Sequence, residues 1–231
     1  TVMIGGTLPL LHAGYRVGQG DTIILESCEY CNSFLSFFPT VAVILNVEED
    51  HLDFFKDLHD IQHSFRQFAE LVPEAGSVIV NADNASAMEA VAGIAHPVFT
   101  FGLDHTADCT AANLQEVDGR PVFDVMVRGE KYAHVELHVY GHHNVLNALA
   151  AASAAYVLGL PGHAVEEGLA SFTGAGRRFE HKGTYHGAEV YDDYAHHPDE
   201  LHALFTTARE MGYQRLVVAF QPHTYSRTAK L

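Results

Sequence analysis

Apolar residues in the first hundred positions form short continuous runs that alternate with longer amphipathic stretches. The runs lack period-two alternation, which is typical of strands buried on both faces of a parallel sheet. The runs cover residues 21–26, 40–46, 77–81 and 97–101, and the helical patterns cover residues 54–71 and a short stretch from Ala85. This order predicts an α/β fold with a mostly parallel sheet and covering helices.

The pattern changes between residues 108 and 140. Short alternating segments at 121–127 and 133–139 are separated by glycine-containing turns at 118–119 and 129–130. Alternation with such turns predicts a small antiparallel sheet. Two helical patterns follow, from Asn144 to about residue 158 and from His163 to about residue 171.

The glycines around residues 174–176 are the best candidate for a domain boundary. A buried strand approaching Val190, a helix from Pro198 to near Gly212 and a strand at 215–220 are expected after it. Proline suits the first position of a helix, which has no use for a backbone N–H. We therefore predict two units, residues 1–175 and 176–231, with the second being the start of a Rossmann-like domain.

Charge and cysteine content exclude several classes of protein. The 231 residues carry 13 Lys and Arg against 29 Asp and Glu, a formal charge of -16. Nucleic acids and anionic membranes bind clustered basic groups, so neither is an expected partner. Three cysteines do not make a disulfide framework, and the sequence contains no signal peptide and no apolar run of the roughly 18–20 residues that a membrane helix needs. These features predict a cytoplasmic protein.

The densest group of reactive side chains lies at residues 191–198, Tyr-Asp-Asp-Tyr-Ala-His-His-Pro. Two acids, two phenols and two imidazoles fall between a predicted strand and a predicted helix. In open α/β sheets this kind of turn is where ligands bind.

Glu26 and His51 each follow a predicted buried strand. If those strands are neighbours, both side chains lie at one carboxyl edge of the sheet. The turn at 46–53 is rich in acids and is either a solvated loop or a divalent-cation site. By residue type alone, imidazole favours zinc over magnesium. The remaining histidines match no zinc-module spacing.

Two further groups have both a structural and a functional interpretation. Asn144 and Asn147 share a helix face and can contact a purine edge, although Asn144 also suits a helix N-cap. The arginines at 177 and 178 and Arg227 suit phosphate or carboxylate, or form surface ion pairs.

Together these segments resemble the Mur ligases, in order along nearly the whole chain. The matching segments are residues 4–6, 26–30, 46–53, 144–151, 174–179, 192–198 and 220–228. The resemblance implies a central domain with a mostly parallel sheet, helices and a small antiparallel sheet, followed by the start of a Rossmann-like C-terminal domain.

The resemblance also implies an activity, which is ATP-dependent amide formation with Mg²⁺. The carboxylate of UDP-N-acetylmuramate would become an acyl phosphate that the amine of L-alanine attacks, a step in peptidoglycan precursor synthesis. A relative that attaches a tripeptide to the same sugar nucleotide is the alternative substrate class. The absence of an insertion between Tyr30 and Pro39 favours alanine.

The resemblance assigns ligands to individual residues. On the nucleotide side, the implied contacts are Glu26 and His51 to magnesium, His143, Asn144 and Asn147 to adenine, Asp192 or Asp193 to the ribose, and Arg177 or Arg178 to the phosphates. On the substrate side, Tyr194, His196 and Arg227 would face the amino acid and the muramyl carboxylate, and Gly5, Gly6 and Glu29 would lie near the UDP-sugar. The two sets imply an interdomain cleft.

The sequence departs from the family pattern in two places. It contains no Gly-Lys-Ser/Thr, the end of a phosphate-binding loop, and Thr224 stands where some relatives carry arginine. We therefore expect an internal piece of a longer ligase that is inactive by itself. The alternative is a nucleotide-binding protein without catalytic activity.

Overall fold

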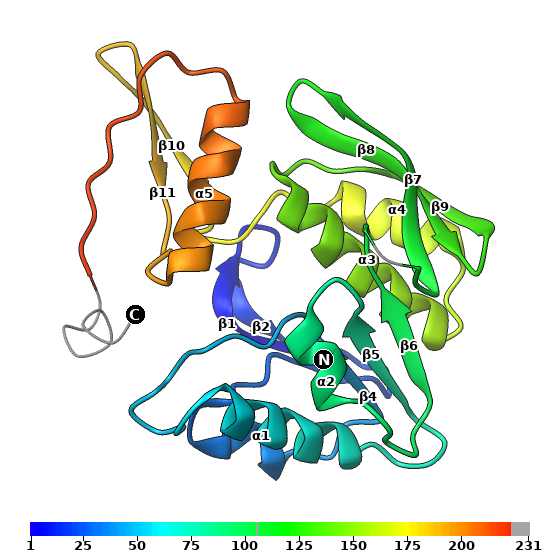
Figure 1. Cartoon of the computed structure of the whole chain (residues 1–231). Coiled ribbons are helices and arrows are strands. Elements are labelled where there is room, and N and C mark those ends of the chain that lie inside the picture. The colour runs from blue at the N-terminus through cyan, green and yellow to red at the C-terminus, as the bar shows by residue number, and fades with distance from the viewer. Residues whose placement is uncertain (105, 223–231) are drawn as a thin grey trace.

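A computed structural model describes residues 1–104 and 106–222, and its centre is a six-stranded sheet with the order β4-β5-β6-β7-β8-β9 (Figure 1). The strands are β4 (Val41–Ile44), β5 (Ser77–Asn81), β6 (Val98–Phe101), β7 (Cys109–Val117), β8 (Arg120–Val127) and β9 (Glu130–Glu136). Pairing is parallel from β4 to β7 and antiparallel from β7 to β9. The predicted mostly parallel α/β arrangement is confirmed.

The antiparallel strands continue the parallel sheet, and do not form a sheet of their own. The junction is the pair Phe101 and Cys109 between β6 and β7. The hairpin turns are Asp118-Gly119 and Arg128-Gly129, and φ is positive at all four residues. Positive φ at both central residues defines the type I′ turn, which matches the twist of the flanking strands. The second turn therefore lies one residue before the predicted 129–130.

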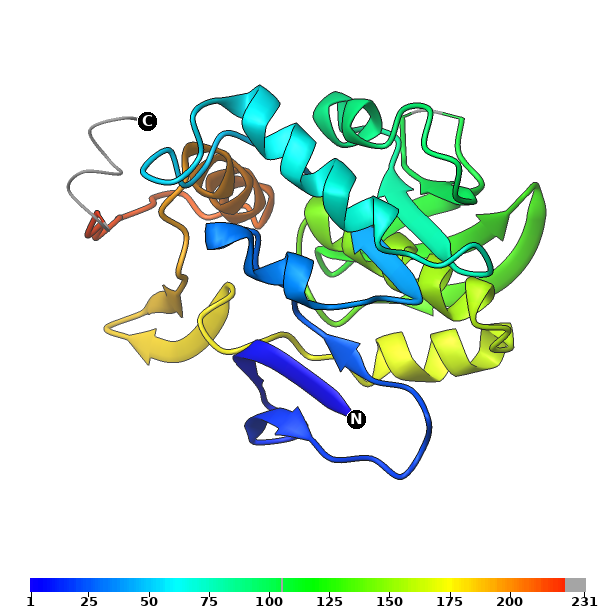
Figure 2. The same cartoon turned by 90° about the horizontal axis from the view of Figure 1, so that it is seen from below.

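Helices cover both faces of the parallel strands (Figures 1 and 2). Val78 and Val80 pack with α1 (Leu58–Glu70) and α2 (Ala85–Ala90) on one face, whereas Ile79 packs with α3 (His142–Val157) and α4 (Gly162–Ala170) on the other. Successive side chains of a strand point to opposite faces, so β5 has no polar face. This burial explains its continuous apolar run.

Two helix starts differ from the prediction. α1 begins at Leu58 and not at residue 54, because the Asp57 carboxylate accepts the Asp60 N–H at 3.0 Å as an N-cap. α3 begins at His142 after Gly141, whose φ is 88°. Asn144 is therefore inside the first turn and is not the N-cap.

The N-terminal residues form a separate three-stranded sheet of β1 (Val2–Leu8), β2 (Ala13–Arg16) and β3 (Ile24–Leu25). The prediction of a strand buried on both faces at 21–26 is wrong. Within residues 1–104 and 106–222, β3 pairs only with β1, and Ile23 and Ile24 are 63% and 58% exposed. The 3₁₀ segment η1 (Tyr30–Ser36) follows and leads into β4.

The C-terminal part consists of the hairpin β10 (Glu180–Tyr185) and β11 (Ala188–Asp192) and the helix α5 (Pro198–Glu210). Pro198 begins α5 and Gly212 follows its end, as predicted. The strand before the turn is exposed at Val190, contrary to expectation. Residues 215–220 form no strand, and Val217 is 80% exposed. A strand needs a hydrogen-bonded neighbour, and the described residues offer this segment none.

No helix in the described ranges combines the length and apolar character required to span a bilayer.

Candidate functional site

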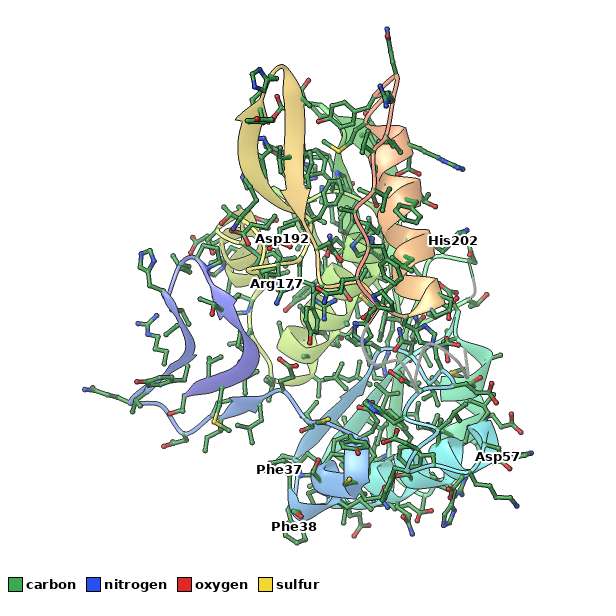
Figure 3. All side chains as sticks on the ribbon, turned by 90° about the vertical axis from the view of Figure 1, so that its left-hand side faces the viewer. Phe37, Phe38, Asp57, Arg177, Asp192 and His202 are labelled. Carbon is green, nitrogen blue, oxygen red and sulfur yellow. The ribbon has the colours of Figure 1, made fainter. Side chains whose placement is uncertain are left out.

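A cleft of about 1160 Å³ lies between the main sheet and the C-terminal part. Its walls come from the 46–50 segment, the start of α3, the linker at 172–180 and the inner side of α5. Figure 3 shows Arg177 and Asp192 close together beside this junction, with α5 and His202 to one side. The cleft therefore collects segments that are far apart in sequence.

One wall of the cleft carries a group of potential cation ligands. His51 Nε2 lies 3.3 Å from Glu29 Oε1 and 3.9 Å from Asp50 Oδ2, and one ligand atom from each residue lies within 4.8 Å of the others. The Tyr30 ring lies beside the His51 ring with centroids 4.6 Å apart, and its hydroxyl donates to Asp53 at 3.0 Å. That hydrogen bond raises the pKa of Tyr30 above its usual value. Tyr30 thus joins η1 to the acidic turn.

The donor set fits a divalent cation. Two carboxylates bring negative charge close together, and a cation between them would relieve their repulsion. Carboxylate oxygens suit magnesium, and the imidazole also suits zinc or manganese.

Glu26 does not join this group. Its carboxylate accepts the Gly5 N–H at 2.7 Å within the small N-terminal sheet. The strands before Glu26 and His51 belong to different sheets, so the expected shared edge does not form. Of the two glutamates in the 26–30 segment, Glu29 is the one that reaches His51.

Three polar side chains at the start of α3 form a row along the cleft. Asn147 Nδ2 donates to Asn144 Oδ1 at 3.2 Å, and Asn144 Nδ2 lies 3.1 Å from His143 Nε2 and donates to the Tyr140 carbonyl at 2.8 Å. The shared helix face is confirmed. Desolvation by the surrounding protein lowers the pKa of His143, so the neutral ring is favoured. A neutral, amide-rich row suits the edge of an uncharged base.

The two predicted arginines are engaged by acids across the linker. Arg177 Nε lies 3.6 Å from Asp192 Oδ2, and its guanidinium lies 4.7 Å from the centre of the Tyr194 ring. Arg178 Nη1 lies 3.5 Å from Glu200 Oε1. These ion pairs are partly exposed, so each stabilises the fold little and leaves the guanidinium able to meet an anion.

Asp193 shapes the turn before α5. Its carboxylate accepts the Phe179 N–H at 2.6 Å and the Ala195 N–H at 2.7 Å. Asp192 has no such backbone bonds among the described contacts and pairs with Arg177. Of the two acids, Asp192 therefore has the freer carboxylate for an outside hydroxyl.

The adjacent histidines of this turn have different surroundings. His196 Nδ1 lies 2.9 Å from the Tyr194 carbonyl, so that nitrogen carries the proton. Its buried Nε2 has no hydrogen-bond partner among the described residues and can accept one from a ligand. His197 accepts the Asp199 N–H through Nδ1 at 3.3 Å and donates through Nε2 to the Glu49 carbonyl at 3.1 Å. His197 thereby connects α5 to the acidic turn.

Glu200 was not singled out from the sequence, although it closes the capping box of α5. Partial burial opposes its ionised form, but the N–H groups of His196 and His197 outweigh this and the pKa of Glu200 is lowered. A glutamate three residues into a helix is the sequence signal that would have identified it. Asp50 was likewise covered only as part of an acidic turn.

The remaining predicted residues lie elsewhere. Gly5 and Gly6 belong to β1, whose Thr7 carbonyl accepts the Gly176 N–H of the linker at 2.9 Å. Arg227 and Thr224 lie outside the described residues. The three cysteines are free thiols, Cys28 and Cys31 being exposed and Cys109 buried. Burial raises the pKa of Cys109 to about 11.

Comparison with known proteins gives two family matches. Residues 7–155 match the Mur ligase middle domain, and residues 177–231 match the Mur ligase, glutamate ligase domain. UDP-N-acetylmuramate--L-alanine ligases of Clostridium novyi and Clostridium perfringens are 46% and 44% identical to the chain over its whole length. The chain spans about half the length of these curated relatives, 50% in both cases.

Solved structures agree with the sequence relatives. The UDP-N-acetylmuramate-alanine ligase of Thermotoga maritima matches with a TM-score of 0.81 and 30% identity, over 99% of this chain and 52% of that one. The UDP-N-acetylmuramate:L-alanyl-gamma-D-glutamyl-meso-diaminopimelate ligase of Neisseria meningitides matches with a TM-score of 0.65 and 28% identity, over 75% of this chain and 57% of that one.

Proposed function

This chain belongs to the Mur ligase family, and from that premise we propose that the protein carrying it joins L-alanine to UDP-N-acetylmuramate with consumption of ATP. The observation that carries the proposal is the cleft, which is lined by Glu29 and Asp50 of the cation-ligand group, by the polar row of α3 and by Arg178. The UDP-N-acetylmuramate--L-alanine ligases of Clostridium perfringens and Clostridium novyi align along the whole chain at 44% and 46% identity. We therefore propose ATP and Mg²⁺ as the cofactors, and UDP-N-acetylmuramate and L-alanine as the two substrates.

We assign the magnesium ligands to Glu29 and His51, with Asp50 beside them. This assignment replaces Glu26, whose carboxylate is bound to the backbone of β1. When bound there, Mg²⁺ would neutralise phosphate charge. The Tyr30 and Asp53 contacts hold both segments in place around His51.

The nucleotide would lie along the other walls of the cleft. Asn144 and Asn147 offer amides to adenine, Asp192 offers a carboxylate to a ribose hydroxyl, and Arg178 offers a guanidinium to phosphate. Arg178 is held by Glu200 in the described structure, so phosphate would compete with that partly exposed ion pair.

The amine-facing side would be formed by the turn before α5. His196 Nε2 can accept a proton or a hydrogen bond from the incoming ammonium or amine, and Tyr194 lies beside it with ring centroids 5.3 Å apart. Holding the amine and the activated carboxylate in one cleft supplies most of what such a reaction needs, because the chemistry is mainly alignment and charge neutralisation. Arg227, Gly5 and Gly6 stay predictions for substrate contact.

The test is an ADP-release assay of the protein that carries this sequence, with UDP-N-acetylmuramate and either L-alanine or the tripeptide L-alanyl-γ-D-glutamyl-meso-diaminopimelate. We expect turnover with L-alanine and little with the tripeptide. Preference for the tripeptide would replace the proposed substrate, and no turnover with either would favour a nucleotide-binding protein without catalysis.

Ligand binding to the 231-residue chain separates the metal assignments. Mn²⁺ binding, followed by electron paramagnetic resonance, is expected to weaken strongly in Glu29→Gln and little in Glu26→Gln. The reverse order would restore Glu26 as the ligand. We also expect no ADP formation by this chain alone, because no Gly-Lys-Ser/Thr is present to hold the phosphates.

A further inference from the structure

Two exposed cysteines bracket the residues that contact His51. Cys28 and Cys31 stand on either side of Glu29 and Tyr30, in a Cys-x-x-Cys arrangement. Glu29 lies 3.3 Å from His51, and the Tyr30 ring packs beside the same histidine. The proposed ligation of a cation by Glu29 makes no use of either thiol.

The backbone brings the two cysteines close together. Glu29 has φ -73° and ψ -25°, and Tyr30 is in the helical part of η1, so the central residues of the turn from Cys28 to Cys31 are both right-handed. A turn of this kind places the Cα atoms of its first and fourth residues less than about 7 Å apart. Disulfides join Cα atoms about 4.4–6.8 Å apart. The pair therefore needs little backbone movement to be cross-linked.

The end of the turn and the residues that follow it are fixed by backbone and side-chain contacts. Cys31 and Asn32 have φ values of 54° and 57°, a left-handed conformation that is unfavourable for non-glycine residues. The Cys28 carbonyl accepts both the Phe34 N–H at 3.0 Å and the Ser33 hydroxyl at 2.8 Å. The segment from Cys31 to Phe34 is thus hydrogen-bonded back to Cys28, and Phe34 is buried in the core.

We propose that Cys28 and Cys31 form a reversible disulfide that switches the position of Glu29 and Tyr30 against His51. The oxidant is a low-molecular-weight disulfide. One cysteine sulfur displaces a thiol from it and forms a mixed disulfide, and the second cysteine sulfur then displaces the other thiol. Two protein thiols become one disulfide, and one small disulfide becomes two small thiols.

Closure of this ring acts directly on the cleft. Glu29 and Tyr30 lie inside the cross-linked loop, so drawing the two sulfurs together shifts the backbone that carries both side chains. The predicted consequence is that the contacts of Glu29 and Tyr30 with His51 and Asp53 weaken. The effect on cation binding rests on the proposed function, whereas the cross-link and the movement do not.

The first experiment detects the bond. The chain is equilibrated with glutathione disulfide and reduced glutathione, remaining thiols are alkylated, and trypsin releases residues 17–56, which contain these two cysteines and not Cys109. We expect this peptide to lose two hydrogens in mass and to recover them with dithiothreitol. Free thiols at high glutathione disulfide, or only glutathione adducts on the two cysteines, would overturn the proposal.

The second experiment reads the movement by hydrogen exchange of residues 46–56 in the oxidised and reduced chain. Faster exchange is expected in the oxidised wild type and not in oxidant-treated Cys28→Ser or Cys31→Ser. Equal exchange in both redox states would refute the switch.

Mn²⁺ titration of the same samples tests the consequence for the cation. Oxidation is expected to weaken Mn²⁺ binding roughly tenfold, as loss of outer-shell support commonly does. Unchanged Mn²⁺ affinity after oxidation would refute the effect on the cation. If the reduced chain binds no Mn²⁺ while the bond and the movement are both observed, the proposed cation site fails and the switch stands.

Discussion

Replacing His197 by alanine is expected to loosen α5 and its contact with the acidic turn. One neutral ring makes two hydrogen bonds, accepting the Asp199 N–H at 3.3 Å and donating to the Glu49 carbonyl at 3.1 Å. Loss of an N-cap costs about 1 kcal/mol, and a typical hydrogen bond contributes about 1 kcal/mol net. The sum of about 2 kcal/mol corresponds to roughly 30-fold in an opening equilibrium.

Hydrogen exchange followed by mass spectrometry measures this directly, since amides of a locally opening helix report the local free energy. His197→Ala is expected to accelerate exchange across α5 by roughly 30-fold. His197→Asn keeps a capping side chain but is too short for Glu49, so about fivefold is expected from the one lost bond. His202→Ala, at an exposed position of the same helix, is the control and should change little. If His197→Ala matched His202→Ala, the connecting role would be refuted.

Three other substitutions test packing and charge. Phe34→Ala should lower the free energy of unfolding, measured by urea titration, by about 3–5 kcal/mol, because the Phe34 side chain is only 2% exposed. The control Phe38→Ala should change it by less than about 0.5 kcal/mol, because Phe38 is 82% exposed. Equal losses in the two variants would contradict the described core. Gly141→Ala should destabilise the contact between α3 and α5 by at least about 1 kcal/mol, because the φ of Gly141 is 88° and the new Cβ would meet Thr207 Oγ1. Hydrogen exchange in α5 should therefore be faster in this variant, and exchange as slow as in the wild type would disprove the prediction. Glu200 has a lowered pKa in the fold, so its contribution is complete above the ordinary value near 4.5 and is lost as pH falls through the lowered value. Glu200→Gln should therefore weaken the exchange protection of α5 at pH 7 and have little effect in acid. If the difference between variant and wild type grew on acidification, the proposed stabilisation by ionised Glu200 would be wrong.

The helix α5 and the strand β5 could be predicted from the sequence, because residues within or next to them carry the signal. Pro198 and Gly212 bounded α5 because both act on the backbone directly. The continuous apolar run of β5 predicted burial on both faces, and the packing of Val78 and Ile79 confirms it.

Apolar character alone did not predict burial where pairing was lacking. Ile24 and Val217 lie in runs as apolar as β5, yet β3 has one partner and residues 215–220 have none in the described part of the chain. Hydrophobic patterning states which residues favour burial, whereas the neighbouring strands decide whether burial occurs.

The candidate site was predicted at the level of segments more than of atoms. Glu26 was the predicted cation ligand and Glu29 was expected near the UDP-sugar, but the path through η1 turns Glu29 toward His51. Likewise Asp192 and Asp193 are equivalent in sequence, and the backbone N–H groups of Phe179 and Ala195 distinguish them. Such choices depend on contacts between distant segments, which spacing does not encode.

The change from parallel to antiparallel pairing at the β6–β7 junction has a consequence for how the chain folds. β7, β8 and β9 are joined by two-residue turns, whereas β4 reaches β5 through α1 and β5 reaches β6 through α2. Contacts between neighbours in sequence form faster than contacts that close long loops. We therefore expect the three-stranded meander to form first and its free edge to receive β6, then β5, then β4, so that the sheet grows toward the N-terminus. Pulse-labelled hydrogen exchange should find β8 protected before β4, and the opposite order would exclude this route.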